Sequence, residues 1–365
     1  MLLMNLDLFV QLGLACAALL YSLIVSGFIV GLLKIRYVSS QEKPFVSVIV
    51  AARNEEANLK VLLPALLQQN YPAYEVIVAN DRSTDDTGDV VRDHQRKVQN
   101  LRIVDITSRS ADMPAKKNAL SEAIKLSKGE ILCFTDADCV PPKQWISELV
   151  AAFEPQIGLA AGYSPYDESL AKSAGDRIAQ KLFHKFISYE ELKAAAWSGG
   201  AIGLNKGWLC TGRNLAYRKR VYDEVGGFEE LKHSVSGDDD LFLQLVRRNT
   251  KWGMRYVTSP ASFVRTSPPE SLRDFVEQRR RHFSAGKFFP FSMKLFFFFF
   301  HLSNLLIFLG FLGFLLGLPE LALGLPTFAV KLAADVTLFL LVSEMLSQKG
   351  FASYFLLMED RKSVV

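Results

Sequence analysis

Apolar residues are concentrated at the two ends of this 365-residue chain, with a more polar region between them. Residues 8–33 and 295–318 contain no Asp, Glu, Lys or Arg, and the second segment opens with an unbroken phenylalanine run at 296–300. A helix of about 20 apolar residues is long enough to cross a bilayer. We therefore predict a transmembrane helix over each segment.

A third apolar segment, 321–342, carries charged residues in its interior. Charges in the middle of a membrane span are costly unless they are paired. Lys331 and Asp335 are four residues apart, a spacing at which two side chains on a helix can pair. We expect a third crossing here, with a helix packed at the membrane surface as the alternative. Residues 295–343 would then hold two helices, and 344–365 a cytosolic tail.

Basic residues indicate how the chain is oriented. The N-terminus carries Asp7 but no Lys or Arg, whereas Lys34 and Arg36 follow the first apolar segment. Cytoplasmic flanks of transmembrane helices are enriched in Lys and Arg. We predict an integral protein of the plasma or inner membrane, with its N-terminus outside and the middle of the chain in the cytosol.

Between the apolar ends, residues 44–287 alternate between strand and helix patterns. The expected strands are 45–51, 75–79, 101–105 and 131–135, and the expected helices are 55–69, 86–98 and 115–127. This alternation predicts an α/β fold with a mainly parallel sheet covered by helices on both faces. We expect one domain made of two halves, 44–140 and 141–287.

Polar residues gather directly after three of these strands. In parallel sheets, ligands bind beyond the carboxyl ends of the strands. Each cluster alone could merely cap a helix, and Asn54 is well placed to cap the helix at 55–69. Three acidic clusters at one edge of a sheet predict a binding site instead. The residues concerned are Arg53, Asn54, Glu55, Asp81, Asp136 and Asp138.

Three motifs in this order resemble the nucleotide-sugar-binding half of the family 2 glycosyltransferases. They are Ala-Arg-Asn-Glu-Glu at 52–56, Asn-Asp-Arg-Ser-Thr-Asp-Asp-Thr at 80–87, and Thr-Asp-Ala-Asp at 135–138. The resemblance implies a GT-A fold, which is Rossmann-like with a mostly parallel sheet. It also implies that Arg53 and Glu55 contribute to binding a nucleotide sugar.

In that family the aspartate after the second strand recognises the nucleotide base, which implies Asp81. The Asp-x-Asp pair holds a divalent cation on the diphosphate, which implies Asp138 as the direct ligand and Asp136 as its support or as a contact to the ribose. Mg²⁺ or Mn²⁺ suits such a site because both prefer oxygen ligands. A bound cation would stabilise the negative charge of the departing diphosphate.

Lys116 and Lys117 stand where the family has a basic residue near the donor. The resemblance implies that Lys116 contacts the nucleotide sugar. The alternative is a pair of solvated lysines on a helix surface. The segment 211–228 likewise resembles the part of the family that binds the acceptor and the sugar, with a plain strand, turn and helix as the alternative.

The run Ser-Gly-Asp-Asp-Asp-Leu at 236–241 resembles the family motif that carries the catalytic base. Aligning its Asp-Leu end places the base at Asp238, with Asp239 and Asp240 as fallback candidates. Gly237 replaces the usual glutamate. An inverting transfer needs one carboxylate to remove the acceptor proton. The alternative is structural, because acidic residues are favourable at the N-terminus of a helix.

Residues 278–282 resemble the Gln-x-x-Arg-Trp motif of membrane-bound members. Gln278 and Arg281 match, and His282 replaces the tryptophan. The resemblance implies that Arg281 neutralises charge on the diphosphate, whereas the missing tryptophan argues against a polymer-extending enzyme. A basic cluster that only sets membrane topology is the alternative.

We interpret the protein as an inverting glycosyltransferase. It would move a sugar from a UDP-sugar or another nucleoside-diphosphate sugar to a hydroxyl of a lipid or lipid-linked saccharide, in cell-envelope or polysaccharide biosynthesis. The alternatives are a processive polysaccharide synthase and a non-catalytic membrane subunit that binds nucleotide sugar. The net charge of +4 arises largely beside the membrane segments and indicates no nucleic-acid partner. Four cysteines without a Cys-x-x-Cys pair indicate no zinc site.

Overall fold

The computed structural model describes residues 2–36, 40, 42–171 and 178–348. It separates into two compact units, which we describe one at a time. The α/β unit comprises Lys34–Phe288. The apolar unit comprises Met1–Leu33 together with Phe289–Val365.

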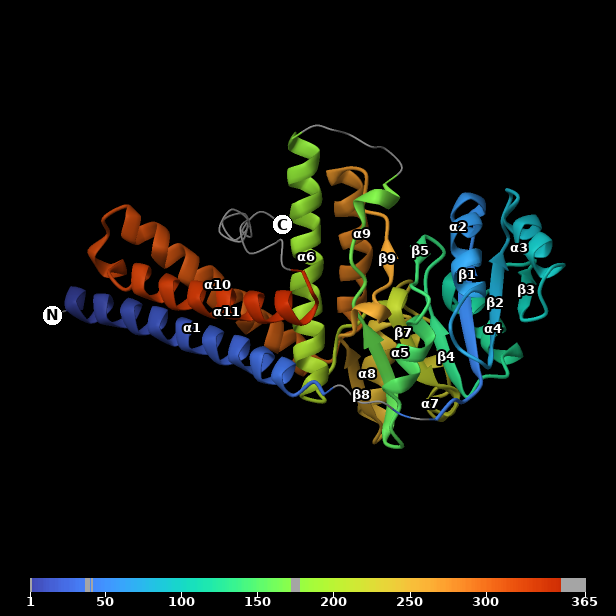
Figure 1. Ribbon diagram of the computed structural model, residues 1–365. Coiled ribbons are helices and arrows are strands. Elements are labelled where there is room, and N and C mark those ends of the chain that lie inside the picture. Colours follow the sequence, from blue (N-terminus) through green and yellow to red (C-terminus); the bar gives the residue numbers. More distant parts are fainter. Residues whose placement is uncertain (1, 37–39, 41, 172–177, 349–365) are drawn as a thin grey trace. The chain divides into compact units, whose positions relative to one another are not determined.

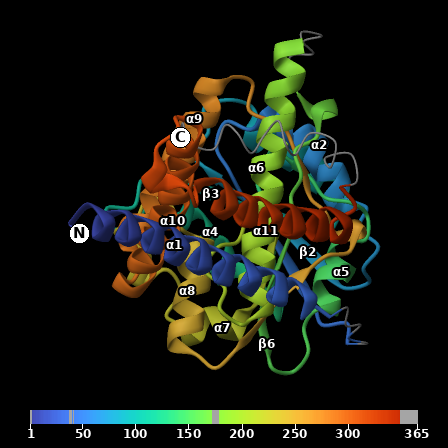
Figure 2. The same ribbon diagram turned by 90° about the vertical axis from the view of Figure 1, so that its left-hand side faces the viewer.

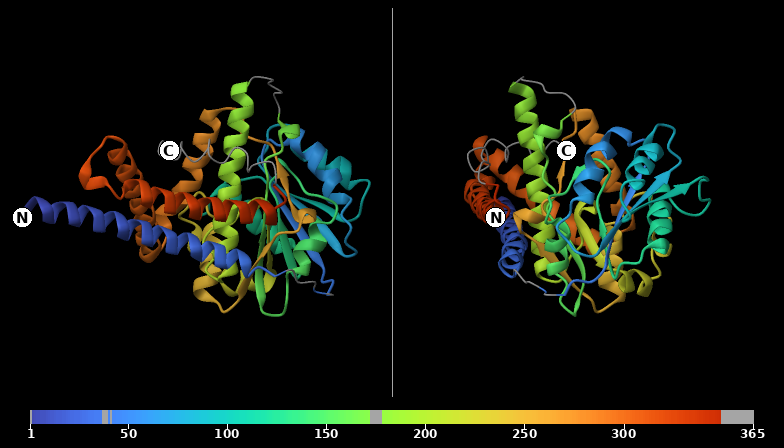
Figure 3. Two further views of the ribbon diagram at one scale, coloured as in Figure 1. Left: turned by 60° about the vertical axis from the view of Figure 1, so that its left-hand side comes forward. Right: turned by 45° about the vertical axis from the view of Figure 1, so that its right-hand side comes forward.

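A seven-stranded sheet forms the centre of the α/β unit (Figure 1). Its order is β3-β2-β1-β4-β7-β6-β8, and all neighbouring pairs are parallel except the two that involve β7. The mostly parallel α/β sheet predicted from the sequence is therefore confirmed, and its twist is visible in Figure 3. The strands are β1 Val46–Ala52, β2 Tyr74–Asp81, β3 Leu101–Ile106, β4 Ile131–Phe134, β6 Ile157–Gly162, β7 Leu215–Arg218 and β8 Gly253–Val257.

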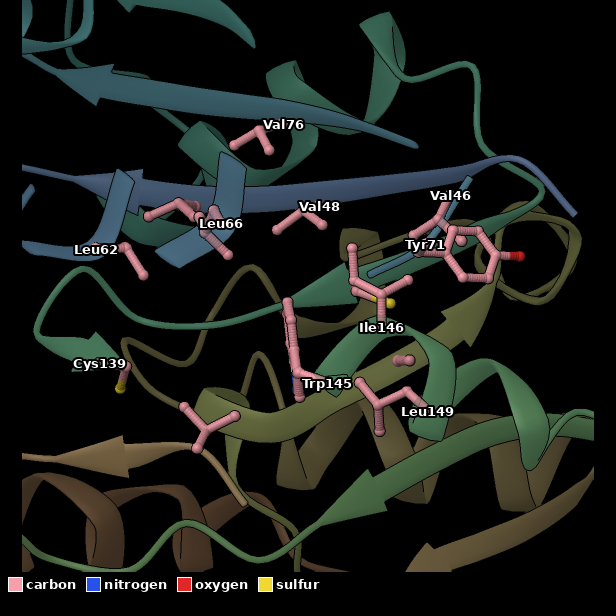
Figure 4. Close-up of a cluster of buried hydrophobic side chains, with 14 of the residues drawn as sticks. Val46, Val48, Leu62, Leu66, Tyr71, Val76, Cys139, Trp145, Ile146 and Leu149 are labelled. Carbon is pink, nitrogen blue, oxygen red and sulfur yellow. The ribbon is translucent and has the colours of Figure 1, made fainter. Parts of the chain in front are cut away.

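Helices cover both faces of the parallel part of this sheet. Val46, Val48 and Val50 face one side of β1, where they share a buried cluster with side chains of α2 and α5 (Figure 4). On the other side α4 packs along β1 and β2. The helices on this part of the sheet are α2 Glu56–Leu67, α3 Thr87–Gln95, α4 Ala115–Leu126 and α5 Trp145–Ala151.

The second half adds a two-stranded sheet and four longer helical elements. Strands β5 (Cys139–Val140) and β9 (Arg265–Thr266) pair antiparallel just after the Asp-x-Asp motif. The aromatic ring of Phe275 packs edge-on against two phenylalanine rings of α6. The helices are α6 Ile178–Gly203, α7 Lys219–Glu224, α8 Asp240–Asn249 and α9 Leu272–Ser284; short 3₁₀ turns are η1 Glu168–Leu170, η2 Gly212–Asn214, η3 Glu229–Leu231, η4 Pro260–Ser262 and η5 Ala285–Phe288.

The strands and helices expected in the first half lie within three residues of the observed ones at every end. One local prediction is wrong: Asn54 does not cap α2. Glu55 occupies the N-cap position without a side-chain hydrogen bond. The Asn54 side chain instead accepts a hydrogen bond from the Thr84 main chain at 2.8 Å, because the loops after β1 and β2 run side by side.

The apolar unit contains α1 Leu2–Leu33, α10 Phe291–Leu315, the turn η6 Pro319–Leu321 and α11 Gly324–Met345. The helices α1, α10 and α11 pack against one another (Figures 1 and 2). Three segments in the described part of the chain are long and apolar enough to cross a membrane: Asp7–Leu33, Phe291–Leu315 and Pro319–Met345. Of the predicted tail, residues 349–365 lie outside the described residues.

The predicted pairing of Lys331 with Asp335 is confirmed. Their charged groups are 2.6 Å apart and both side chains are buried. The hydroxyl of Tyr21 on α1 donates a hydrogen bond to the other carboxylate oxygen of Asp335 at 2.7 Å. This polar contact therefore joins α1 to α11 inside an otherwise apolar unit.

Candidate active site

The strand ends that carry the sequence motifs lie at one edge of the sheet. β1 is paired in parallel with β2 on one side and with β4 on the other, so the three strands end in the same direction. Asp81 is the last residue of β2, and Asp136 follows β4 by two residues. The structure thus places both aspartates beyond the carboxyl ends of neighbouring parallel strands, as the sequence predicted.

Lys116 connects the two halves of the α/β unit. Its ammonium lies 2.9 Å from a carboxylate oxygen of Asp136 and 3.0 Å from one of Asp238. All three residues line one small pocket. Asp138, which is exposed, is close enough to Asp136 for their charges to interact. We call Lys116, Asp136, Asp138 and Asp238 the acidic cleft.

The three consecutive aspartates at 238–240 have different surroundings. Asp239 accepts hydrogen bonds from the main-chain N–H groups of Gly212, at 2.9 Å, and Asp240, at 2.7 Å. Asp240 accepts one from the Cys210 N–H at 2.8 Å. These two carboxylates hold the loop before η2 against the start of α8. Asp238 instead faces the ammonium of Lys116.

Charges in the cleft influence one another. Burial opposes ionisation of Asp136, but the Lys116 ammonium prevails and lowers the pKa of that carboxyl below its usual value. Partial desolvation and the negative charge of Asp136 raise the pKa of Asp138. Although desolvation acts against it, the carboxylates of Asp136 and Asp238 raise the pKa of Lys116 well above its usual value. The lysine is therefore a permanent cation between two carboxylates.

Lys117 is not solvated, so the alternative of two solvated lysines is wrong for this residue. Its side chain is fully buried. The ammonium donates hydrogen bonds to the main-chain oxygens of Ser234 and Ser236. Lys116, by contrast, pairs with carboxylates of the acidic cleft.

The residues expected to bind the nucleotide lie in the loops after β1 and β2. Asp81 is buried and both of its carboxylate oxygens accept hydrogen bonds from the Arg82 guanidinium, at 2.7 and 3.1 Å. Arg53 is exposed. Glu55 is half-buried, accepts a hydrogen bond from the Asn58 amide at 2.6 Å, and donates its own N–H to the Thr87 hydroxyl. These contacts fix the two loops side by side.

Helix α9 brings the last motif toward the acidic cleft. The Tyr166 hydroxyl donates a hydrogen bond to the Gln278 side chain at 3.1 Å. His282 is close enough to Asp136 to influence the pKa of that carboxyl. Arg281 is exposed on the same helix. The structure therefore brings this helix to the edge of the cleft, with Gln278 anchored on its inner side.

Arg213 is a residue of the cleft surroundings to which the sequence interpretation assigned no role. Its guanidinium pairs with Glu191 at 2.7 Å and lies over the Tyr166 ring. Its charge reaches both Asp136 and Asp138. Its place inside the 211–218 motif was the available signal, but a motif does not reveal which side chain turns inward.

A divalent cation fits the chemistry of the cleft. Among the described residues, no three His, Cys, Asp or Glu side chains converge as a complete metal site. Asp136 and Asp138 supply two carboxylates, and hard cations such as Mg²⁺ commonly take one or two protein carboxylates and complete their shell with phosphate oxygens and water. The donor set therefore suits a cation that arrives with a diphosphate.

Comparisons with known proteins agree with this geometry. Two relatives are the probable glycosyltransferase YdaM of Bacillus subtilis, 29% identical over 249 residues, and the glycosyltransferase AglE of Haloferax volcanii, 28% identical over 247 residues. The alignments cover 66% and 67% of this chain, and 55% and 72% of the relatives. The β-monoglucosyldiacylglycerol synthase of Nostoc sp. is 27% identical over 60% of this chain and 44% of its own length. The chain thus spans about half the length of YdaM and of the synthase.

A solved structure shares the fold. The mannosyltransferase PcManGT from Pyrobaculum calidifontis, in complex with GDP-Man and Mn²⁺, aligns over 98% of this chain and 99% of its own, with a TM-score of 0.53 and 19% identity. The fold is thus of the GT-A type. The model of the family described as "Glycosyltransferase like family 2" matches residues 43–285, most of the chain. This protein belongs to the family 2 glycosyltransferases.

Proposed function

We propose that this protein is an inverting glycosyltransferase that moves a sugar from a nucleoside-diphosphate sugar, with a UDP-sugar as the expected donor, to an acceptor hydroxyl. The observation that carries the proposal is the position of Lys116 between Asp136 and Asp238. The ammonium of Lys116 contacts both Asp136, the carboxylate expected on the donor side, and Asp238, the carboxylate expected on the acceptor side. A donor and an acceptor bound at these two groups would meet within one cleft.

The donor side consists of groups at the ends of β1, β2 and β4. Asp81 would accept a hydrogen bond from the nucleotide base, and Arg53 and Glu55 would border the nucleotide. Asp136 and Asp138 would hold a Mg²⁺ or Mn²⁺ ion, which, when bound, stabilises charge on the leaving diphosphate. Lys116, a permanent cation, would turn from its carboxylates to phosphate oxygens.

The acceptor side is built around Asp238. Its carboxylate would take the proton from the acceptor hydroxyl as that oxygen attacks the anomeric carbon. The new glycosidic bond forms as the bond to the diphosphate breaks, so the configuration at the anomeric carbon inverts. Gln278 and Arg281 on α9 would approach from the same side, and Arg281 would add positive charge near the diphosphate.

A lipid or lipid-linked saccharide is the proposed acceptor. Three helices long and apolar enough to cross a membrane support this. So does the relative from Nostoc, whose name describes synthesis of a glucosylated diacylglycerol. We place the protein in the plasma or inner membrane with the α/β unit in the cytosol, where nucleotide sugars would reach it.

The proposal is tested by UDP release from a panel of UDP-sugars by purified full-length protein with Mn²⁺ and lipid vesicles. Asp238→Asn should lower the turnover number about 10²–10⁴-fold, the usual contribution of a general base, and leave donor binding intact. Asp138→Ala should weaken metal-dependent donor binding. Asp93→Asn, at an exposed position on α3, is the control and should behave as wild type.

The two alternatives give different results in the same assay. A non-catalytic subunit would bind UDP-sugar with no turnover, and Asp238→Asn would change nothing. A processive synthase would release many UDP molecules per acceptor and yield long products. Single-sugar products together with loss of turnover in Asp238→Asn support the proposed function.

A further inference from the structure

Two consecutive lysines on α4 have opposite surroundings. Lys116 reaches into the acidic cleft, as described above. Lys117 is completely buried, and its ammonium donates hydrogen bonds to the main-chain oxygens of Ser234 at 2.5 Å and Ser236 at 2.7 Å. Adjacent residues of α4 therefore bind both the carboxylate of Asp238, through Lys116, and the backbone that precedes it, through Lys117.

The backbone that Lys117 binds leads directly to Asp238. Ser236 is followed by Gly237, whose φ of +88° lies in the left-handed region that glycine adopts without strain. A Cβ at Gly237 would come within 2.5 Å of the Leu241 side chain. The path of residues 234–238 is thus determined by Lys117 on one side and by the start of α8 on the other.

A lysine at this buried position carries a cost in desolvation free energy. An ammonium loses hydration when it is buried, and an apolar side chain of similar length would fill the same space without that penalty. What the lysine adds is a pair of directed hydrogen bonds to carbonyl oxygens two residues apart, together with a positive charge near Asp238 and Asp239. Those bonds fix the backbone in one conformation, which apolar packing would do less strictly.

We propose that Lys117 is a positioning residue for the transfer reaction: it fixes segment 234–238 so that the Asp238 carboxylate stays against Lys116. The inference rests on the proposed function, in which Asp238 is the base. Lys117 touches neither donor nor acceptor, so its loss should affect the turnover number and not donor binding. A displacement of about 1 Å at a reacting group can lower a rate about 10²-fold.

The test compares Lys117→Met, Lys117→Gln and Lys117→Arg in the full-length protein in lipid vesicles containing diacylglycerol. The probe is UDP release from whichever of UDP-glucose, UDP-galactose and UDP-N-acetylglucosamine the wild-type protein uses fastest. We expect Lys117→Met to lower kcat about 10–100-fold with the donor KM within about twofold. Lys117→Arg, which keeps a charged donor, should recover part of kcat.

Lys125→Met is the matched control. Lys125 lies on the same helix but is exposed, and its ammonium pairs with Glu122 at 2.6 Å. Its substitution should change neither kcat nor KM. Equal kcat in Lys117→Met and wild type would overturn the inference. So would a parallel loss of donor binding, or failure of both Lys117→Met and Lys117→Gln to fold, since either result would make Lys117 a general structural element.

Failure of the proposed function would look different. It would appear as a wild-type protein that releases no UDP from any of the donors. Hydrogen exchange of the 234–240 peptide would still decide whether Lys117 holds this segment. Faster exchange in Lys117→Met, but not in Lys125→Met, is the expected result, and equal exchange would refute the positioning role.

Discussion

Asp238, Asp239 and Asp240 are the same amino acid in a row, yet each has a different environment. Asp239 and Asp240 accept hydrogen bonds from main-chain N–H groups, whereas Asp238 faces an ammonium. The sequence motif indicated the run, and alignment on its last two residues selected Asp238. Asp239 and Asp240 are tied down by Gly212 and Cys210, which are distant in sequence, so no local pattern could reveal that.

We predict that Asp239→Asn gains stability relative to the wild-type protein as the pH rises from about 4 to 7. Burial and the neighbouring Asp238 raise the pKa of Asp239 to about 6, above the ~3.9 of an unfolded aspartate. Between these values the folded state binds more protons than the unfolded state, so the free energy of unfolding falls with rising pH. Asparagine does not titrate and should avoid this loss, about 3 kcal/mol at pH 7.

The measurement is the difference in melting temperature between variant and wild type at several pH values. Hydrogen bonds lost in the variant would shift this difference by an amount that does not depend on pH. Asp93→Asn, exposed on α3, should give a flat line. If this melting-temperature difference did not change with pH for Asp239→Asn either, the raised pKa of Asp239 would be contradicted.

A second residue-scale prediction concerns Asn214, which is fully buried beside β7. Its amide donates to the main-chain oxygens of Tyr163 and Ser262, each at 2.8 Å, and accepts from the Trp145 indole at 2.9 Å. Asn214→Ala should lower the free energy of unfolding by about 3 kcal/mol or more, because three buried polar groups lose a partner at about 1–3 kcal/mol each. Denaturant unfolding of the variant checks this.

Asn249→Ala provides the comparison for that experiment. Asn249 is exposed at the end of α8, where its amide donates a hydrogen bond to Glu230 at 3.4 Å and accepts one from the Arg248 guanidinium at 3.2 Å. Its truncation should change the unfolding midpoint little. Equal effects of the two substitutions would mean that the buried amide network contributes no more to the free energy of unfolding than the exposed Asn249 side chain does.

At the scale of elements, the sequence predicted the first half of the α/β unit more fully than the second. β1, β2 and β4 are runs of apolar and β-branched residues bounded by polar loops, so local pattern alone identifies them. β7 is only four residues long and lies antiparallel between β4 and β6. Its place depends on pairing with distant strands, which hydrophobic pattern does not encode. The same holds for Asn54, whose partner Thr84 lies in another loop.

The contact between α1 and α11 yields a prediction for the apolar unit. Asp335→Leu would leave the Lys331 ammonium buried without its carboxylate, and breaking a buried ion pair from one side typically costs about 3–5 kcal/mol. The double variant Lys331→Leu/Asp335→Leu removes both charges and should recover most of the stability. Thermal unfolding in detergent measures both.

The order of thermal stability among these variants tests the role of the ion pair. If the pair stabilises the unit only through charge balance, the single variant is the least stable and the double variant approaches wild type. Tyr21→Phe removes only the hydroxyl that contacts Asp335 and should cost less than the single charge deletion. A double variant as unstable as Asp335→Leu would show that the charges themselves are required.

At the scale of the whole molecule, residues from sites more than 100 positions apart form the candidate site. Lys116, Asp136 and Asp238 come from α4, the loop after β4 and the loop before α8. The parallel order of β1, β2 and β4 accounts for the position of Asp136, whereas Asp238 was assigned to the site through the family resemblance alone. The individual contacts, such as the burial of Lys117 or the pairing of Arg213 with Glu191, depend on packing and could not be inferred from spacing.

We predict that a UDP-sugar raises the melting temperature of the full-length protein only when Mn²⁺ or Mg²⁺ is present. A ligand at about 100 times its Kd stabilises the folded state by about 2.7 kcal/mol through mass action. Without the cation, the carboxylates of Asp136 and Asp138 would repel the diphosphate. A thermal shift of equal size in EDTA would contradict the assignment of these two aspartates.

The ammonium of Lys116 gives the acidic cleft a built-in counter-ion. Two carboxylates from separate loops can sit close together without mutual repulsion forcing them apart. The polypeptide should consequently survive prolonged dialysis against a chelator with its tertiary structure intact, unlike proteins that need their ion to fold. It also follows that a divalent cation should bind only weakly in the absence of nucleotide, and that cation and nucleotide should bind together as one complex.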